Sequence, residues 1–255
     1  GSLRGSAIKI SGANPTIENC IIKNCVLTNS AHGAVSFHST SSTIKNTLIY
    51  GTTGGPAIYI DNAGDNSSII NCTIANNHIG LNADDALVNV NNSIIYNNTT
   101  NITSYGFVDF DYSNVEGGVS GSGMVGNINS DPLFVDPANG DYSLSNYSPA
   151  IGAGTATGAP STDIEGNPRP NPAGSNPDMG AYENALGTPA EHIVITNDTL
   201  VVLEDASSTI DLLDNDLILN ITSFTLAIVD STDNGTIALV GDTDLTYTPD
   251  ENFFG

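Results

Sequence analysis

The sequence predicts an all-β protein: a parallel β-helix (solenoid) with a C-terminal cap, followed by a partial β-sandwich. Three observations predict this architecture. Short apolar segments repeat about every 23 residues in the first part of the chain, a Pro- and Gly-rich segment then interrupts the repeat, and short alternating strands resume near the C-terminus. The corresponding domains are residues 1–115, 116–185 and 191–255, with a linker at 186–190.

Four copies of one repeat predict the β-helix. In each copy an asparagine lies between two apolar residues, at Asn19, Asn46, Asn71 and Asn92. Each is preceded by two apolar residues that flank a single residue, in the pairs Ile8/Ile10, Val35/Phe37, Ile58/Ile60 and Leu81/Ala83. Alternation of period two, interrupted by Gly and Asn, is typical of strands, and such coils stack about 4.8 Å apart. Asn also tolerates left-handed corners, where its amide can hydrogen-bond the next amide in the stack.

Over residues 5–115 this pattern resembles the right-handed parallel β-helix repeat proteins of bacteria. The predicted pairing brings His38, Asp61 and Asp84 onto successive coils about 5 Å apart, with Tyr59 and Asp85 beside them. These five are candidate ligand-binding residues. Three interpretations stay open: a solvated strand face, a site for calcium or a sugar, or a catalytic site. Carboxylates about 5 Å apart suit a retaining glycoside hydrolase, and an imidazole can serve as acid or base.

Two enzyme families with β-helices differ from this sequence. Polysaccharide lyases of that fold resemble one another in using a Lys or Arg base near calcium, and this region offers only Arg4, Lys9, Lys23 and Lys45. Polygalacturonases carry Gly-Asp-Asp followed by Gly-His-Gly, whereas here residues 83–85 read Ala-Asp-Asp and His32-Gly33 comes earlier. We therefore assign no catalytic residue.

The segment 116–185 is predicted to cap the β-helix. Its motifs include Asp-Pro-Leu-Phe-Val-Asp-Pro (131–137), Asp-Ile-Glu-Gly-Asn-Pro-Arg-Pro (163–170) and Pro-Asp-Met-Gly-Ala-Tyr-Glu (177–183). In this order they resemble the choice-of-anchor Q domain of bacterial proteins, which implies a module that closes a β-helix and precedes surface-sorting tails. Arg169 is expected to pair with Asp163, Asp178 or Glu183. Eight apolar residues are expected to cover the last open coil: Leu133, Phe134, Tyr142, Leu144, Ile151, Ile164, Met179 and Tyr182.

The C-terminal segment alternates short apolar strands with Asp, Asn and Gly turns, which favours a β-sandwich. The order Leu-Leu-Asp-Asn-Asp (212–216), Asn-Gly-Thr (234–236) and Tyr-Thr-Pro (247–249) resembles the cadherin-like and Ig-like tandem repeats of large bacterial adhesins. The resemblance implies a truncated repeat and a calcium site, with metal ligands among Asp198, Glu204, Asp205, Asp214 and Asp216.

The net charge of −23 excludes a typical nucleic-acid binder, because phosphate affinity needs clustered Lys and Arg. The acidity belongs to the C-terminal half, since residues 1–106 carry a net charge of −1 and residues 186–255 carry −13. No apolar run predicts membrane insertion. We expect a fragment of a large bacterial extracellular or cell-surface protein, with polysaccharide or cell-surface glycan as the partner. The predicted function is a non-catalytic structural, adhesive or carbohydrate-binding module; the alternative is a polysaccharide lyase or glycoside hydrolase that uses His38, Asp61 and Asp84.

Overall fold

The computed structural model describes residues 6–12, 14–28, 32–61 and 66–253, and it divides into two units, residues 1–190 and 191–255. Strands make up nearly all of the regular secondary structure of the described residues in both units. Within the described ranges, no helix is long and apolar enough to cross a membrane.

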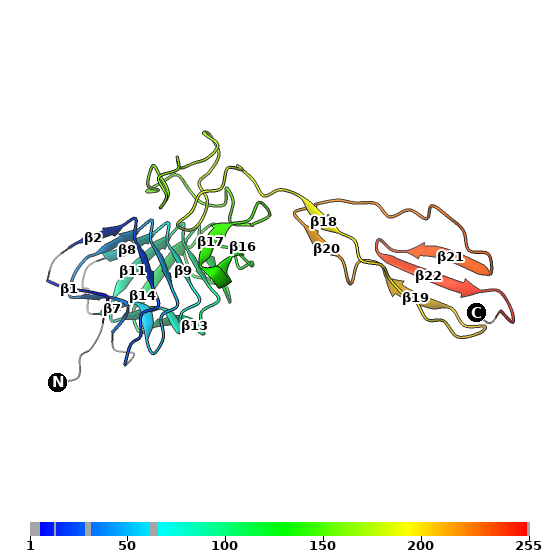
Figure 1. The fold of residues 1–255 in the computed structure, drawn as a ribbon, viewed down its shortest axis with the longest axis horizontal. Coiled ribbons are helices and arrows are strands. Elements are labelled where there is room, and N and C mark those ends of the chain that lie inside the picture. Colours follow the sequence, from blue (N-terminus) through cyan, green and yellow to red (C-terminus); the bar gives the residue numbers. More distant parts are fainter. Residues whose placement is uncertain (1–5, 13, 29–31, 62–65, 254–255) are drawn as a thin grey trace. The chain divides into compact units, whose positions relative to one another are not determined.

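The first unit contains a solenoid of three parallel sheets, to which each coil contributes one strand per sheet (Figure 1). The first sheet contains β1 (Ile8–Ser11), β4 (Val35–His38), β7 (Pro56–Asp61), β10 (Ile79–Asp84) and β13 (Thr100–Ser104). The second contains β2 (Thr16–Glu18), β5 (Thr43–Lys45), β8 (Asn66–Ile70), β11 (Leu87–Asn91) and β14 (Phe107–Asp111). The third contains β3 (Ile21–Lys23), β6 (Leu48–Tyr50), β9 (Thr73–Ala75), β12 (Ile94–Tyr96) and β15 (Asn114–Val115). The predicted parallel β-helix is confirmed.

The register of the first sheet matches the apolar pairs of the sequence repeat. Val35 lies opposite Ile58, and Ile58 lies opposite Leu81. All three side chains are completely buried, and they belong to one core cluster that runs through the solenoid. Because side chains alternate across a strand, this register also determines which residues face outward.

The corner asparagines adopt the expected left-handed conformation, with φ of 55°, 46°, 48° and 51° at Asn19, Asn46, Asn71 and Asn92. One amide contact joins neighbouring coils of this column, from Asn92 Nδ2 to Asn71 Oδ1 at 3.3 Å. Elsewhere the amides bind backbone carbonyls of the segment after residue 150: Asn46 Nδ2 donates to Thr162 O at 2.7 Å. The expected continuous amide ladder is therefore replaced in part by bonds to the cap segment.

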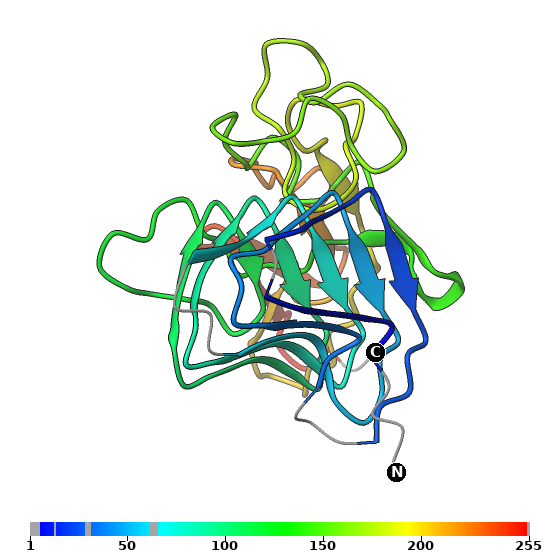
Figure 2. The ribbon, with the colours of Figure 1, turned by 90° about the vertical axis from the view of Figure 1, so that its left-hand side faces the viewer.

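The cap segment contains β16 (Phe134–Asp136), a 3₁₀ turn at Pro137–Asn139 and β17 (Asp141–Leu144). It lies along the side of the coils (Figure 2), where Tyr142 packs on Leu48 and Ala75, and Met179 belongs to a cluster with Ile94. The expectation that its apolar residues cover the last open coil is wrong. Their partners are outward residues of the third sheet, which supplies a long apolar flank.

The apolar end of the last coil is contacted instead by the first residues of the segment 116–185. Val119 and Met124 pack against the core cluster that contains Phe110, and the same two residues share a hollow with Ile102 and Val108. These residues precede the Pro-rich motifs, so a short loop near residues 119–124 covers the coil end.

The second unit contains two small antiparallel sheets. In one, β18 (His192–Val194) pairs with β20 (Leu217–Leu219). In the other, β22 (Asp244–Pro249) lies between β19 (Ser208–Asp211) and β21 (Gly235–Val240). The alternating strands that the sequence predicts are thus present.

Candidate functional site

The candidate residues of the β-helix lie on the outer side of the first sheet, in two neighbouring rows. Ser36, Tyr59 and Asn82 are aligned across β4, β7 and β10. The next row aligns His38 with Asp61, and Asp61 with Asp84. The structure therefore brings together four of the five predicted residues: His38, Tyr59, Asp61 and Asp84.

Two hydrogen bonds join these side chains across successive coils. His38 Nδ1 lies 2.8 Å from Asp61 Oδ2, and the Tyr59 hydroxyl donates to Asp84 Oδ2 at 3.2 Å. Each carboxylate thus has a partner on the adjacent coil. Asp85 does not join them, because it occupies an exposed turn after β10 with φ of 51°.

This face is largely covered. Tyr59 is 6% exposed and Ser36 is 0% exposed, while the side chains of His38 and Asp61 are 17% and 34% exposed. Among the described residues, neither His38 Nε2 nor Asn82 Oδ1 has a hydrogen-bond partner. Because these side chains are largely covered, this region is not a fully solvated strand face.

His32 is the residue of this cluster that the sequence did not indicate. Its ring lies edge-on to His38 and Tyr59, with centroid distances of 5.7 and 6.4 Å. The approach of the His32 ring to these two side chains depends on the next residue, Gly33. The backbone N–H of Gly33 donates to Ser36 Oγ at 2.8 Å. A Cβ at Gly33 would lie 2.7 Å from Tyr59 N, so only glycine fits without displacement. The sequence signal for this packing of His32 over His38 and Tyr59 is the His-Gly pair before β4.

Burial is the main cause that raises the pKa of Tyr59 to about 12, and the negative charges of Asp61 and Asp84 raise it further. The phenol is therefore protonated throughout the neutral range and can act as a hydrogen-bond donor. Its bond to Asp84 fixes that carboxylate in place.

A second polar cluster lies inside the cap segment. Arg169 donates from Nε to Glu183 Oε2 at 2.8 Å and from a terminal nitrogen to Asn46 Oδ1 at 2.9 Å. The expected pairing of Arg169 with a local carboxylate is confirmed, with Glu183 as the partner. Burial raises the pKa of Asp178 to about 7, although backbone amides of Asn184 and Gly152 donate to its two oxygens and oppose the shift. Because Arg169, Glu183 and Asp178 are all buried, this cluster holds the cap together and offers no open site.

The five predicted calcium ligands do not converge. Asp216 Oδ1 accepts a hydrogen bond from Thr196 N, after β18, whereas Asp205 Oδ1 accepts one from Asn252 N, after β22. Asp198 and Asp214 lie near the first of these places, since Asn215 Nδ2 contacts Asn197 O at 3.4 Å. In the part of the chain that the structure describes, no group of three or more His, Cys, Asp or Glu side chains could hold a metal ion. The calcium site stays a prediction.

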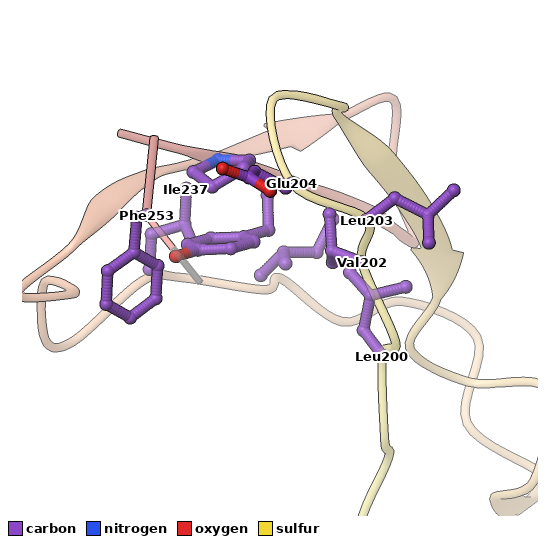
Figure 3. Close-up of a pocket in the computed structure, with 9 residues that line it drawn as sticks. Leu200, Val202, Leu203, Glu204, Ile237 and Phe253 are labelled. Atoms are coloured by element: carbon purple, nitrogen blue, oxygen red, sulfur yellow. The ribbon is translucent and has the colours of Figure 1, made fainter. Parts of the chain in front are cut away.

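Glu204 lies in an apolar hollow of the second unit with a volume of about 540 Å³ (Figure 3). The other lining residues carry no carboxylate: Leu200, Val202, Leu203, Ile237, Leu245, Tyr247, Pro249 and Phe253. Among the described residues, Glu204 is therefore the one carboxylate that lines this hollow.

Comparison with protein families agrees with both units. A model described as a right handed beta helix region matches residues 2–130, about half of the chain. The chain belongs to the right-handed β-helix family. In this right-handed β-helix protein, residues 189–255 also match a model described as a bacterial Ig domain. No curated protein and no solved structure matches the chain. The two matches establish the architecture and leave the ligand to be inferred from the site.

Proposed function

We propose that the chain is a non-catalytic module of a bacterial extracellular or cell-surface protein, in which the β-helix contacts carbohydrate and so serves adhesion. The combination of a right-handed β-helix with a bacterial Ig domain supports this proposal, because both are typical of extracellular or surface proteins. The β-helix provides a stiff scaffold on which exposed side chains recur at each coil.

The proposal that the module is non-catalytic rests on one observation: both candidate carboxylates are hydrogen-bonded to side chains of the adjacent coil. Retaining hydrolysis needs one carboxyl group as acid and one as nucleophile, both directed at the sugar. Here Asp61 is bound to His38 and Asp84 is bound to Tyr59, a side chain that is only 6% exposed. These bonds tie adjacent coils together, and each carboxylate directs one oxygen at a protein side chain instead of at a sugar.

For the segment 116–185, we propose a choice-of-anchor Q type cap. The ordered motifs around Arg169 and Met179 support the assignment, as does the way the segment attaches to the β-helix. Asn71 Nδ2 donates to Asp178 O at 3.1 Å, and the Ala181 N–H donates to Thr73 Oγ1 at 3.0 Å. The cap and the coils therefore share one hydrogen-bond network.

The alternative function is a polysaccharide lyase or glycoside hydrolase. One observation favours it: the 2.8 Å contact between His38 Nδ1 and Asp61 orients the imidazole, as a carboxylate does for a general base. The Nε2 atom of such a dyad would have to reach the substrate, but in this structure it is buried.

One experiment separates the two functions. The purified chain is incubated with a panel of neutral and acidic polysaccharides, and both retention and release of reducing or unsaturated ends are measured. We expect retention of at least one polysaccharide without cleavage. Cleavage that Asp61→Ala and Asp84→Ala abolish, but that Asp109→Ala on the exposed face of β14 leaves intact, would establish the enzyme instead.

A further inference from the structure

A polar groove crosses three coils at the corner between the third and first sheets. It has a volume of about 470 Å³, within the range of sites for small ligands. Its lining comes from the loops after β6, β9 and β12: Thr52, Thr53, Gly54, Asn76, Asn77, His78, Asn97 and Thr99. None of the candidate residues named from the sequence lies in it.

The exposed groups of the groove form a column with the spacing of the coils. The Thr52 N–H donates to Asn77 Oδ1 at 3.0 Å, and the Asn77 N–H donates to Asn98 Oδ1 at 2.9 Å. These bonds set Thr52, Asn77 and Asn98 at equivalent positions, so the residues that follow them are equivalent as well. Thr53, His78 and Thr99 therefore recur about 4.8 Å apart along the solenoid axis. All three are exposed.

The floor beneath this column is rigid. Asn77 is 4% exposed, and its Nδ2 donates to Ile49 O and Ala75 O, both at 3.0 Å. A ligand that binds here orders few groups that were free before, which lowers the entropic cost of association.

The chemistry of the lining selects an uncharged ligand. Hydroxyls, amides and an imidazole supply both donors and acceptors, and no lining side chain is an acid, a lysine or an arginine. Beside the groove, Glu116 Oε2 accepts a hydrogen bond from Asn97 N at 2.7 Å. Its negative charge disfavours an anionic ligand at this end.

We propose that this groove binds a neutral oligosaccharide, which runs along the solenoid axis and presents hydroxyls to Thr53, His78 and Thr99. The inference rests on the proposed function, because it assigns the carbohydrate contact of that function to one place. It also narrows the ligand to neutral rather than uronic acid chains.

The test measures binding of the full chain to neutral oligosaccharides and to a uronic acid oligosaccharide of equal length by calorimetry. The variant T53V/T99V removes two exposed hydroxyls and keeps the β-branched shape. It should weaken binding of the neutral ligand about tenfold, since each hydrogen bond contributes modestly. T157V, which removes an exposed hydroxyl of the cap segment, should leave the affinity unchanged.

The outcomes distinguish this inference from the function on which it rests. If a neutral oligosaccharide binds and T53V/T99V, together with a separate His78→Ala variant, binds as well as the wild type, the groove is not the site and the proposed function stands. Equal or tighter binding of the uronic acid chain overturns the choice of a neutral ligand. If no carbohydrate binds, the carbohydrate part of the proposed function falls together with the groove.

Discussion

Arg169 and Glu183 form a completely buried ion pair, with 2.8 Å between Nε and Oε2 and no exposed side-chain area on either partner. The same guanidinium contacts Asn46 of the solenoid at 2.9 Å. One cation thus neutralises an internal carboxylate of the cap and links the cap to the coils.

Replacing Arg169 by Met should destabilise the first unit by about 3–5 kcal/mol, because it leaves Glu183 buried without a partner. Denaturant unfolding measures this change. Lys45→Met is the matched control, since it breaks a partly exposed pair with Glu18 and should cost about 0–1 kcal/mol. Equal effects of the two substitutions would contradict the role assigned to burial.

The stability of the first unit should fall as pH rises from about 4 to about 7. Burial raises the pKa of Asp178 from 3.8 to about 7 in the folded chain. The folded state therefore binds this proton more tightly than the unfolded state, and its contribution is complete below pH 4 and lost through pH 7. Glu183 shifts in the same direction, also because of burial.

Unfolding free energies measured across this pH range test whether stability falls as pH rises. Asp178→Asn should reduce the slope of unfolding free energy against pH, because the titrating group is gone. This holds whatever the substitution does to stability at any one pH. Asp109→Asn, an exposed change, should leave the slope as it is. An Asp178→Asn protein with the slope of the wild type would show that Asp178 does not titrate in this way.

Tyr59→Phe should cost about 0.5–1.5 kcal/mol, because Asp84 loses the hydroxyl that donates to it. The wild-type protein should also contain a phenol that ionises only near pH 12. The difference in ultraviolet absorbance between the wild type and Tyr59→Phe across an alkaline titration isolates this group. A difference curve with its midpoint near pH 10 would mean that the face is open to water.

Gly33→Ala should destabilise the β-helix by about 1–3 kcal/mol, because the new Cβ meets backbone atoms that cannot move aside. The contacts would be 2.5 Å to Val35 O and 2.7 Å to Tyr59 N. Gly121→Ala is the control, since its Cβ would meet only the flexible side chain of Met124, at 2.9 Å. In thermal unfolding, the melting temperature of Gly33→Ala should be well below that of Gly121→Ala.

The strand register was accessible from the sequence because it depends on local rules. Side chains alternate along a strand, and left-handed corners at residues such as Asn71 and Asn92 set where each coil turns. Those two rules suffice to align His38 with Asp61 and Asp61 with Asp84.

Features that depend on packing between distant segments could not be predicted from the sequence. The cover over Tyr59 requires the backbone of Gly33 to approach another coil, which no periodicity encodes. The docking of the cap uses backbone carbonyls such as Thr162 O, whose positions follow from the folded loops. The groove appears only when coils of unequal length align Thr53 with His78 and Thr99.

Calcium binding is the prediction of the sequence that the second unit can test most directly. Three of the predicted ligands lie nearest to one another, Asp198, Asp214 and Asp216, because the segment after β18 meets the segment before β20 there. The sequence-based prediction requires calcium to raise the melting temperature of this unit relative to a chelator, since a ligand that binds only the folded state stabilises it. Asp214→Asn should abolish the increase, whereas Asp242→Asn, at an exposed turn before β22, should not. An unchanged melting temperature in calcium and chelator would remove the metal site, and would leave these carboxylates as hydrogen-bond acceptors for the loops, as Asp216 already is for Thr196.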